Sequence, residues 1–281
     1  MAAATELLAE DWLGACRRAA EGLREVLREH PTSRERVIET GERGGGGDRT
    51  LVIDAAAEDA VFTELERLHR AGYRFTAVSE ERGTVEFGGD DLIVVIDPID
   101  GSLNAKRGLP HHALSVAVAD GPTMADVLFG YVFDLGPGEE WHALRRHGAF
   151  LDRRRFDPPP ERRGRHGRLE VVAVESADPR WLAASADALC AVTNRVRALG
   201  SIAVSLCQLA AARVDGMATL WRCRAVDAAA AQLIVRESGG LVRFTSMDDP
   251  LAAPLDLEPH SPVVAARTAA ALEELATVPS A

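Results

Sequence analysis

The stretch VVIDPIDGSLN, residues 94–104, joins an apolar run to two aspartates, Asp97 and Asp100, and then to Gly101 and Ser102. A continuous apolar run of this kind is typical of a strand that is buried on both faces of a sheet. A strand that ends in acids brings negative charge to the edge of a core, where a carboxylate loses solvation unless a partner neutralises it. The stretch therefore predicts either a turn whose carboxylates cap backbone amides or a site for a cation.

Three further acids lie beside the ends of apolar segments: Asp54, Glu80 and Asp227. Carboxylate oxygens suit Mg²⁺ or Mn²⁺, whereas a zinc site is expected to include Cys or His. Gly101 and Ser102 can open a helical turn whose free N–H groups bind a phosphate oxygen. Cations beside a phosphate cradle indicate phosphoryl chemistry.

The composition limits the class of protein. With 281 residues, of which 47% are hydrophobic, the chain is long enough for one large domain or two packed lobes. Its formal net charge of −11 argues against a nucleic acid or an anionic membrane as the main partner. The four cysteines lack the spacing of a disulfide framework, and the acidic N-terminal segment resembles neither a signal peptide nor a membrane span. We therefore expect a cytoplasmic protein.

Hydrophobic periodicity predicts an α+β first half. Residues 5–29 and the residues from Asp54 to Gly72 have the spacing of amphipathic helices. The glycine-rich segment 41–50 is expected to be a mobile loop, and it lacks the Lys-Ser/Thr ending of a P-loop. Strand-like runs follow, and they predict an antiparallel sheet: YRFTAVSEERG, DLIVVIDPID, HALSVAVADG, ADVLFGYVFD and a hairpin around RRHGAFLDRRR.

The second half is expected to be an α/β unit. The Arg- and Pro-rich segment 153–168 indicates a joint between two lobes, and we favour a solvated connector there over an anion-binding patch. Strand-like and helix-like runs alternate after it: LEVVAVES, IAVSLCQLAAAR, AAAAQLIVRESGG and SPVVAARTAAALEELA. These features predict an N-terminal lobe at residues 1–160 and a C-terminal lobe at residues 161–281.

Five segments resemble, in the same order, the signatures of the inositol monophosphatase superfamily of Mg²⁺-dependent, lithium-sensitive phosphatases: TLVIDAAAE, AVSEERG, VVIDPIDGSLN, RALGSIAVSLCQLAAARVDG and VDAAAAQLIVRESGG. The third is similar to D-P-[IL]-D-G-[ST]-x-N and the fifth to D-x-A-A-x-x-L-I-x-x-E-x-G-G. The resemblance implies an α/β (α+β) fold, namely the layered α-β-α-β-α sandwich of the sugar phosphatases. It also implies a homodimer that hydrolyses a phosphate monoester of a sugar or inositol.

The resemblance further implies a set of metal ligands. Glu80, Asp97 and the carbonyl of Ile99 would hold one Mg²⁺, while Asp97, Asp100 and Asp227 would hold a second. A third ion would lean on Glu80, and Mn²⁺ is the alternative metal. Asp227 at the start of a helix also fits a capping role, which does not exclude metal binding.

The same resemblance assigns the residues that handle water and substrate. Ser102, hydrogen-bonded to Asp54, would act with Glu80 to orient and deprotonate the attacking water. The backbone amides of Gly101 and Ser102 would cradle the phosphate. Two residues of the RALGS segment would meet the ring hydroxyls of the substrate: Gly200 and Ser201.

Departures from the family pattern leave the substrate open. Val226 replaces the usual tryptophan, and no acid lies about seven residues before Asp227. The segment that contains Arg222 and Arg224 resembles the archaeal-type branch, which hydrolyses both fructose 1,6-bisphosphate and inositol phosphates. The two arginines could bind a second phosphate in bidentate fashion or form a structural ion pair. A nucleotide 3′-phosphatase, a histidinol-phosphatase and a non-catalytic sugar-phosphate-binding protein are also compatible with these segments.

Overall fold

The computed structural model describes residues 2–43 and 49–280, so the glycines at 44–47 of the predicted mobile loop lie outside the described residues. The flanks of that segment differ from the prediction. They pair as two antiparallel strands, β1 (Glu39–Arg43) and β2 (Arg49–Leu51). The expectation of a loop over the whole of 41–50 was therefore wrong at both ends, where backbone pairing satisfies the polar groups of the chain.

The larger sheet has seven strands within the described residues. Their order across the sheet is β3 (Phe75–Ser79), β4 (Gly83–Asp100), β5 (Ala113–Ala119), β6 (Val127–Asp134), β7 (Glu139–Leu144), β8 (Gly148–Leu151) and β9 (Arg154–Arg155). The long strand β4 passes β3 twice. Along β3, the partners among residues 83–86 run backwards in number, as in an antiparallel pair, whereas those among residues 93–96 run forwards, as in a parallel pair. Residues 93–96 also pair with β5, so a strand flanks them on each edge.

The smaller sheet belongs to the second half of the chain. Its order is β11 (Val196–Arg197), β10 (Val172–Glu175), β12 (Gly216–Thr219), β14 (Val263–Ala266) and β13 (Leu241–Phe244). Strand β10 is parallel to β11 and β12, whereas β14 is antiparallel to β12 and β13. Parallel strands bring their carboxyl ends to one edge, which is where ligands bind in open α/β sheets.

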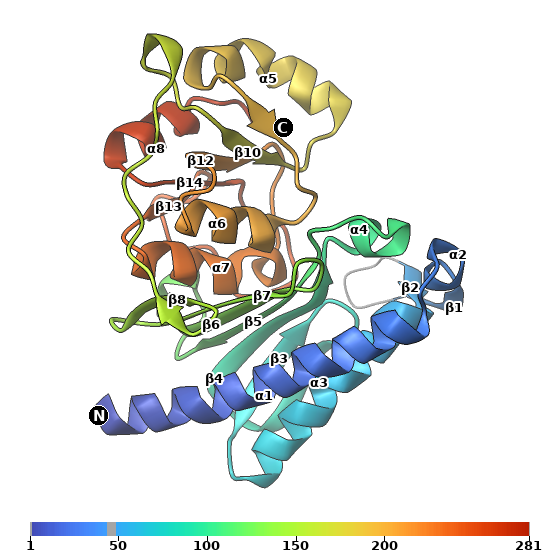
Figure 1. Cartoon of the computed structure of the whole chain (residues 1–281). Coiled ribbons are helices and arrows are strands. Elements are labelled where there is room, and N and C mark those ends of the chain that lie inside the picture. Colours follow the sequence, from blue (N-terminus) through green and yellow to red (C-terminus); the bar gives the residue numbers. More distant parts are fainter. Residues whose placement is uncertain (1, 44–48, 281) are drawn as a thin grey trace.

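Helices separate and cover the two sheets in five layers (Figure 1). Six helices make up the three helical layers: α1 (Ala2–Glu29) and α3 (Val52–Arg70) outside the larger sheet, α6 (Ile202–Ala210) and α7 (Ala225–Glu237) between the sheets, and α5 (Pro179–Val192) and α8 (Ala269–Ala276) outside the smaller sheet. Short helices α2 (Ser33–Arg36) and α4 (Ser102–Arg107) lie at one end, and 3₁₀ turns occur at Met124–Asp126 and Arg165–Gly167. The predicted α-β-α-β-α sandwich is confirmed.

Alternation along the strands explains why each sheet can be covered on both faces. On β10, Val172 and Val174 pack with α5 and α8, whereas Ala173 points to the core around α6 and α7. On β4, Val94 and Ile96 pack with α1 and α3, whereas Val95 faces the central helices. Successive side chains point to opposite faces of a strand, so apolar residues at every position bury both faces.

The central helix α7 approaches the larger sheet very closely. Its residues Ala228–Ala231 are all at most 1% exposed. A Cβ atom added at Gly130 of β6 would lie 2.5 Å from the carbonyl oxygen of Ala230. The run of small residues in DAAAAQLI is therefore matched by a missing side chain on the facing strand, and together they fix the distance between helix and sheet.

The sequence patterns predicted most of the strands and both central helices, but they did not predict α5, β12 and β13 as separate elements. They also placed an apolar run before the second helix, whereas α3 already begins at Val52, so Asp54 lies in its first turn. The division into lobes at residue 160 remains a prediction. The core around α6 and α7 includes residues from both sides of that position.

Candidate active site

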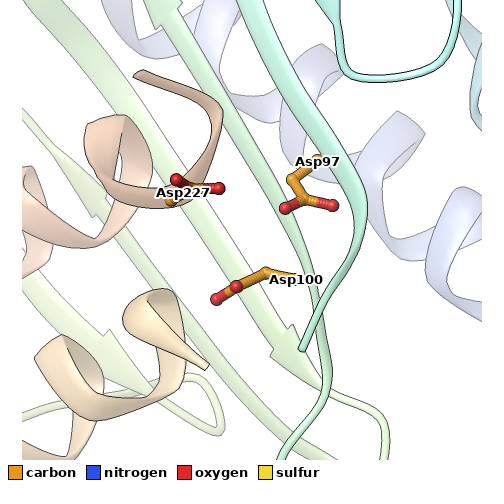
Figure 2. Close-up of side chains that lie close together, drawn as sticks. All are labelled: Asp97, Asp100 and Asp227. Carbon is orange, nitrogen blue, oxygen red and sulfur yellow. The ribbon is translucent and has the colours of Figure 1, made fainter. Parts of the chain in front are cut away.

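Three aspartates from two elements converge between the sheets. Asp97 and Asp100 lie at the end of β4, and Asp227 lies in the first turn of α7. One carboxylate oxygen from each of the three lies within 4.8 Å of the others. Figure 2 shows the three side chains arranged around a common space. An all-oxygen set of this kind could hold a metal ion.

The electrostatics of the cluster favour a bound cation. Burial and then the charge of Glu80 raise the pKa of Asp97 well above its ordinary value. Burial and then the charge of Asp227 raise the pKa of Asp100 to about 8. Burial also raises the pKa of Asp227, although Arg224 opposes that shift. Each shift shows that the ionised carboxylates are costly without a neutralising partner.

The carboxylate of Asp100 is anchored by the start of α6. Its Oδ2 accepts a hydrogen bond of 2.5 Å from the hydroxyl of Ser201 and one of 2.7 Å from the backbone N–H of Ala203. The same hydroxyl accepts a hydrogen bond of 3.1 Å from the N–H of Val204 and so caps the helix. The side chain of Ser201 therefore connects α6 to the aspartate cluster, whereas it was predicted to meet substrate.

Glu80 lies beside the three aspartates but makes a different contact. Its Oε1 accepts a hydrogen bond of 2.7 Å from Nη2 of Arg224, and the same nitrogen lies 3.5 Å from Oδ1 of Asp227. The structure thus places Arg224 directly between two of the predicted metal ligands. Arg222 is exposed, and no hydrogen bond or ion pair joins it to another described residue.

A cavity of about 360 Å³ adjoins Asp97 and brings four predicted site residues together: Asp54, Glu80, Ile99 and Ser102. Lys106, which was not predicted, also lines it. Oδ2 of Asp54 accepts a hydrogen bond of 3.3 Å from the N–H of Leu51 and lies 4.0 Å from Nζ of Lys106. Its Oδ1 is buried with no hydrogen-bond partner among the described residues. Burial raises the pKa of Asp54 to about 6. The predicted hydrogen bond from Ser102 to Asp54 is not formed among the described residues, although both side chains line the cavity.

The turn between β4 and α4 depends on glycine. Gly101 has φ of 85°, in the left-handed region, and it is the residue from which α4 begins. A Cβ atom there would lie 2.9 Å from the carbonyl oxygen of His111 and 3.0 Å from that of Gly200. Glycine at this position therefore lets the turn pack against these two carbonyl groups, and the first N–H groups of α4 have no acceptor within the helix.

A second cavity of about 360 Å³ adjoins Asp100 and Asp227, and it is also lined by Asn104, Glu175, Gly200 and Ser201. Nδ2 of Asn104 donates hydrogen bonds of 2.7 Å to the carbonyl oxygen of Leu199 and 2.9 Å to that of His111. A Cβ atom at Gly200, where φ is 85°, would lie 2.7 Å from that nitrogen. The loop that carries Gly200 is thereby fixed against α4.

Glu175 holds the same loop from the other side, and it was not among the site residues predicted from the sequence. The carboxylate accepts hydrogen bonds of 2.9 Å from the N–H groups of Leu199 and Gly200 and of 2.6 Å from the hydroxyl of Ser205. Burial raises its pKa, and these three hydrogen bonds oppose the shift. The feature that identified Asp97 in the sequence also applies to Glu175, because Glu175 lies at the end of an apolar strand.

The five-layered fold is that of the sugar phosphatases, and its aspartate cluster lies beside two cavities. The chain belongs to the inositol monophosphatase family, because the model of that family matches residues 8–279. Members of this family act on small phosphate esters, and the protein is therefore a phosphoric monoester hydrolase.

Individual relatives carry different names. The chain is 34% identical over 210 residues to the fructose-1,6-bisphosphatase/inositol-1-monophosphatase of Methanothermobacter thermautotrophicus, covering 71% of this chain and 72% of the relative. It is 31% identical over 230 residues to the Nus factor SuhB of Haemophilus influenzae, covering 80% and 82%. A solved inositol monophosphatase-fructose 1,6 bisphosphatase has the same fold, with a TM-score of 0.77, 23% identity and coverage of 94% and 98%. Within the described residues, no helix is long and apolar enough to cross a membrane.

Proposed function

We propose that the protein hydrolyses the phosphate monoester of a sugar or inositol in a reaction that depends on Mg²⁺. The observation that carries the proposal is the convergence of Asp97, Asp100 and Asp227, with ligand oxygens within 4.8 Å of one another. Gly101 and Ser102 lie directly after this cluster in the chain, at the start of α4. Asp97 and Ser102 line the first cavity, and Asp100 and Asp227 line the second, so cation ligands and the start of α4 lie next to each other, as phosphoryl transfer requires.

The donor set fits magnesium, because it consists of hard carboxylate oxygens, with neither His nor Cys among the ligands. Asp97, Asp100 and Asp227 would hold one ion, while Glu80, Asp97 and the carbonyl of Ile99 would hold another, with a third ion at Glu80. When bound, such ions stabilise the attacking and leaving oxygens of an in-line displacement. Mn²⁺ would satisfy the same ligands.

The residues of the chain would position the water and the phosphate. The hydroxyl of Ser102 would donate to Oδ1 of Asp54, which has no hydrogen-bond partner in the described part of the chain, and its own lone pairs would orient the attacking water. The carboxylate of Glu80 would accept the proton of that water. The backbone N–H groups of Gly101 and Ser102 would bind the phosphate oxygens at the start of α4.

The test is phosphate release from a panel of sugar, inositol and nucleotide phosphates and histidinol phosphate, with Mg²⁺ or chelator. Wild type is compared with Asp97→Asn, which keeps the side-chain volume and removes the charge. We expect activity only for wild type with Mg²⁺. Equal activity of the two proteins, or full activity in chelator, would refute the proposal. Binding of an ester without turnover would instead favour a sugar-phosphate-binding protein.

A second candidate is a dual fructose-1,6-bisphosphatase and inositol monophosphatase, the activity in the name of the Methanothermobacter relative. Arg224 is the observation in its favour, because its guanidinium lies at the aspartate cluster. Arg222→Ala and Arg224→Ala would then weaken hydrolysis of the bisphosphate more than that of a monophosphate. A uniform loss across substrates would contradict a second phosphate site.

We further propose that the protein is a cytoplasmic homodimer. Sedimentation of the purified protein as a monomer would contradict the dimer.

A further inference from the structure

We propose that Arg224 is an internal cation that occupies metal-ligand oxygens until a metal ion displaces it, after which its guanidinium binds the phosphate of the substrate. This inference rests on the proposed function, because Glu80 and Asp227 are ligands only in the proposed metal sites. The observation behind it is direct. One nitrogen, Nη2 of Arg224, lies 2.7 Å from Oε1 of Glu80 and 3.5 Å from Oδ1 of Asp227.

The position of Arg224 allows the side chain to move while the backbone stays in place. Its backbone N–H donates a hydrogen bond of 2.9 Å to Oδ2 of Asp227, which caps the start of α7. Its side chain contacts Glu80 and Asp227 and is 23% exposed, so one side of it faces solvent. Rotation of the side chain would therefore break the two ion pairs without unwinding the helix.

The balance of charge favours displacement by a divalent ion. Four carboxylates lie together at the site: Glu80, Asp97, Asp100 and Asp227. One guanidinium carries a single charge against these four acids, whereas a divalent ion brings two charges to the same oxygens.

The displaced guanidinium would remain next to the cavity, because the backbone of Arg224 is fixed at the start of α7. Its five N–H donors form a planar fork that matches two phosphate oxygens, and the ligand class is therefore a phosphate monoester dianion. Metal binding would thus create the anion site as well as the metal site. By linkage, phosphate and metal would then strengthen each other's binding through this one side chain.

Calorimetric titration of metal-free protein with Mg²⁺, and separately with inorganic phosphate, tests the inference. The variants are Arg224→Gln and, as a matched loss of one charge two residues away, Arg222→Gln. We expect Arg224→Gln to bind Mg²⁺ about ten- to a hundredfold more tightly than wild type, since no charge-assisted hydrogen bond must be broken. Arg222→Gln is expected to bind Mg²⁺ like wild type.

The phosphate titrations test the second part. With Mg²⁺ present, we expect Arg224→Gln to bind inorganic phosphate about tenfold more weakly than wild type, and without Mg²⁺ to bind it equally well. A loss of the same size with and without Mg²⁺ would overturn the displacement mechanism. Circular dichroism checks that Arg224→Gln folds. If Arg224→Gln does not fold, Arg224→Lys, which lacks the bidentate fork, takes its place in the phosphate titrations.

The outcomes separate this inference from the proposed function. If wild type binds no Mg²⁺, the proposed metal site fails. If wild type, Arg224→Gln and Arg222→Gln all bind Mg²⁺ with one affinity, the metal site stands and the role of Arg224 is refuted. If both variants gain affinity equally, the effect is one of net charge, and displacement of the guanidinium is refuted as well.

Discussion

Replacement of Gly130 by alanine is expected to disturb the active site through packing alone. Gly130 lies on β6, facing α7, and it lines neither of the two cavities beside the aspartates. A Cβ atom there would lie 2.5 Å from the carbonyl oxygen of Ala230 and 3.1 Å from its Cα and carbonyl carbon. These contacts are with backbone, so rotation of a side chain cannot relieve them.

The geometry gives the size of the effect. Ordinary contacts of a Cβ atom begin at 3.4 Å, so helix and strand must separate by about 0.9 Å if the Cβ is to fit. The helix cannot simply recede, because Ala228–Ala231 are all at most 1% exposed and pack into the central core. Overpacking of this kind costs about 1–3 kcal/mol of unfolding free energy. Since α7 also carries Asp227, a shift approaching 1 Å is expected to lower kcat by up to about a hundredfold.

Urea denaturation and steady-state kinetics measure the two effects. The matched control is Gly14→Ala in α1, where the added Cβ meets only the mobile end of Arg18 at 3.3 Å. Alanine should stabilise that helix by about 0.5–1 kcal/mol. If Gly130→Ala were as stable as wild type, the close approach of α7 would not be a real constraint. If it were less stable but fully active when folded, the position of Asp227 would not depend on this contact.

Three further predictions concern single side chains. Burial raises the pKa of Glu58 from 4.5 to about 7, so between these pH values the native state binds more protons than the unfolded state, and stability falls as the pH rises. Glu58→Gln should therefore raise the unfolding free energy by up to about 3 kcal/mol at pH 8 and by almost nothing at pH 4.5. Denaturation in the presence of chelator measures this difference. Glu175→Gln turns a donor toward the N–H groups of loop 199–200, which should cost about 2 kcal/mol and raise KM more than it lowers kcat; unchanged KM would contradict a role in holding that loop. Ser102→Ala should lower kcat about a hundredfold or more without changing the melting temperature, while Ser102→Thr should retain activity in the same assay.

Much of the fold follows from local patterns in the sequence. The continuous apolar run before Asp97 predicted a strand that is buried on both faces, and Val94 and Ile96 do pack into one core while Val95 packs into the other. Helix α5 was not predicted, although Asp178 caps it and Pro179 occupies its first turn. The strand pairing on either side of residues 44–48 could not be predicted, because the glycine and the two glutamates of β1 are of residue types depleted in strands.

The candidate site was less predictable than the fold because most of its contacts connect distant parts of the chain. The acids could be selected individually, since each lies at the end of an apolar segment. That Ser201 would donate to Asp100, or that Arg224 would contact Glu80, depends on how α6 and α7 pack against the larger sheet. From sequence alone, Arg224 had two possible roles, a phosphate contact or an ion pair, and the structure shows the ion pair.

The arrangement of the ligands makes the site a product of packing between the two halves of the chain. Asp97 and Asp100 come from the larger sheet, whereas Asp227 comes from a central helix of the second half. Two contacts set the distance between them: the hydroxyl of Ser201 on Asp100, and the close approach of α7 to Gly130. Neither contact can form within one half alone. A fragment that contains only one half should therefore lack the complete aspartate cluster, so the site requires both predicted lobes even if each could fold by itself.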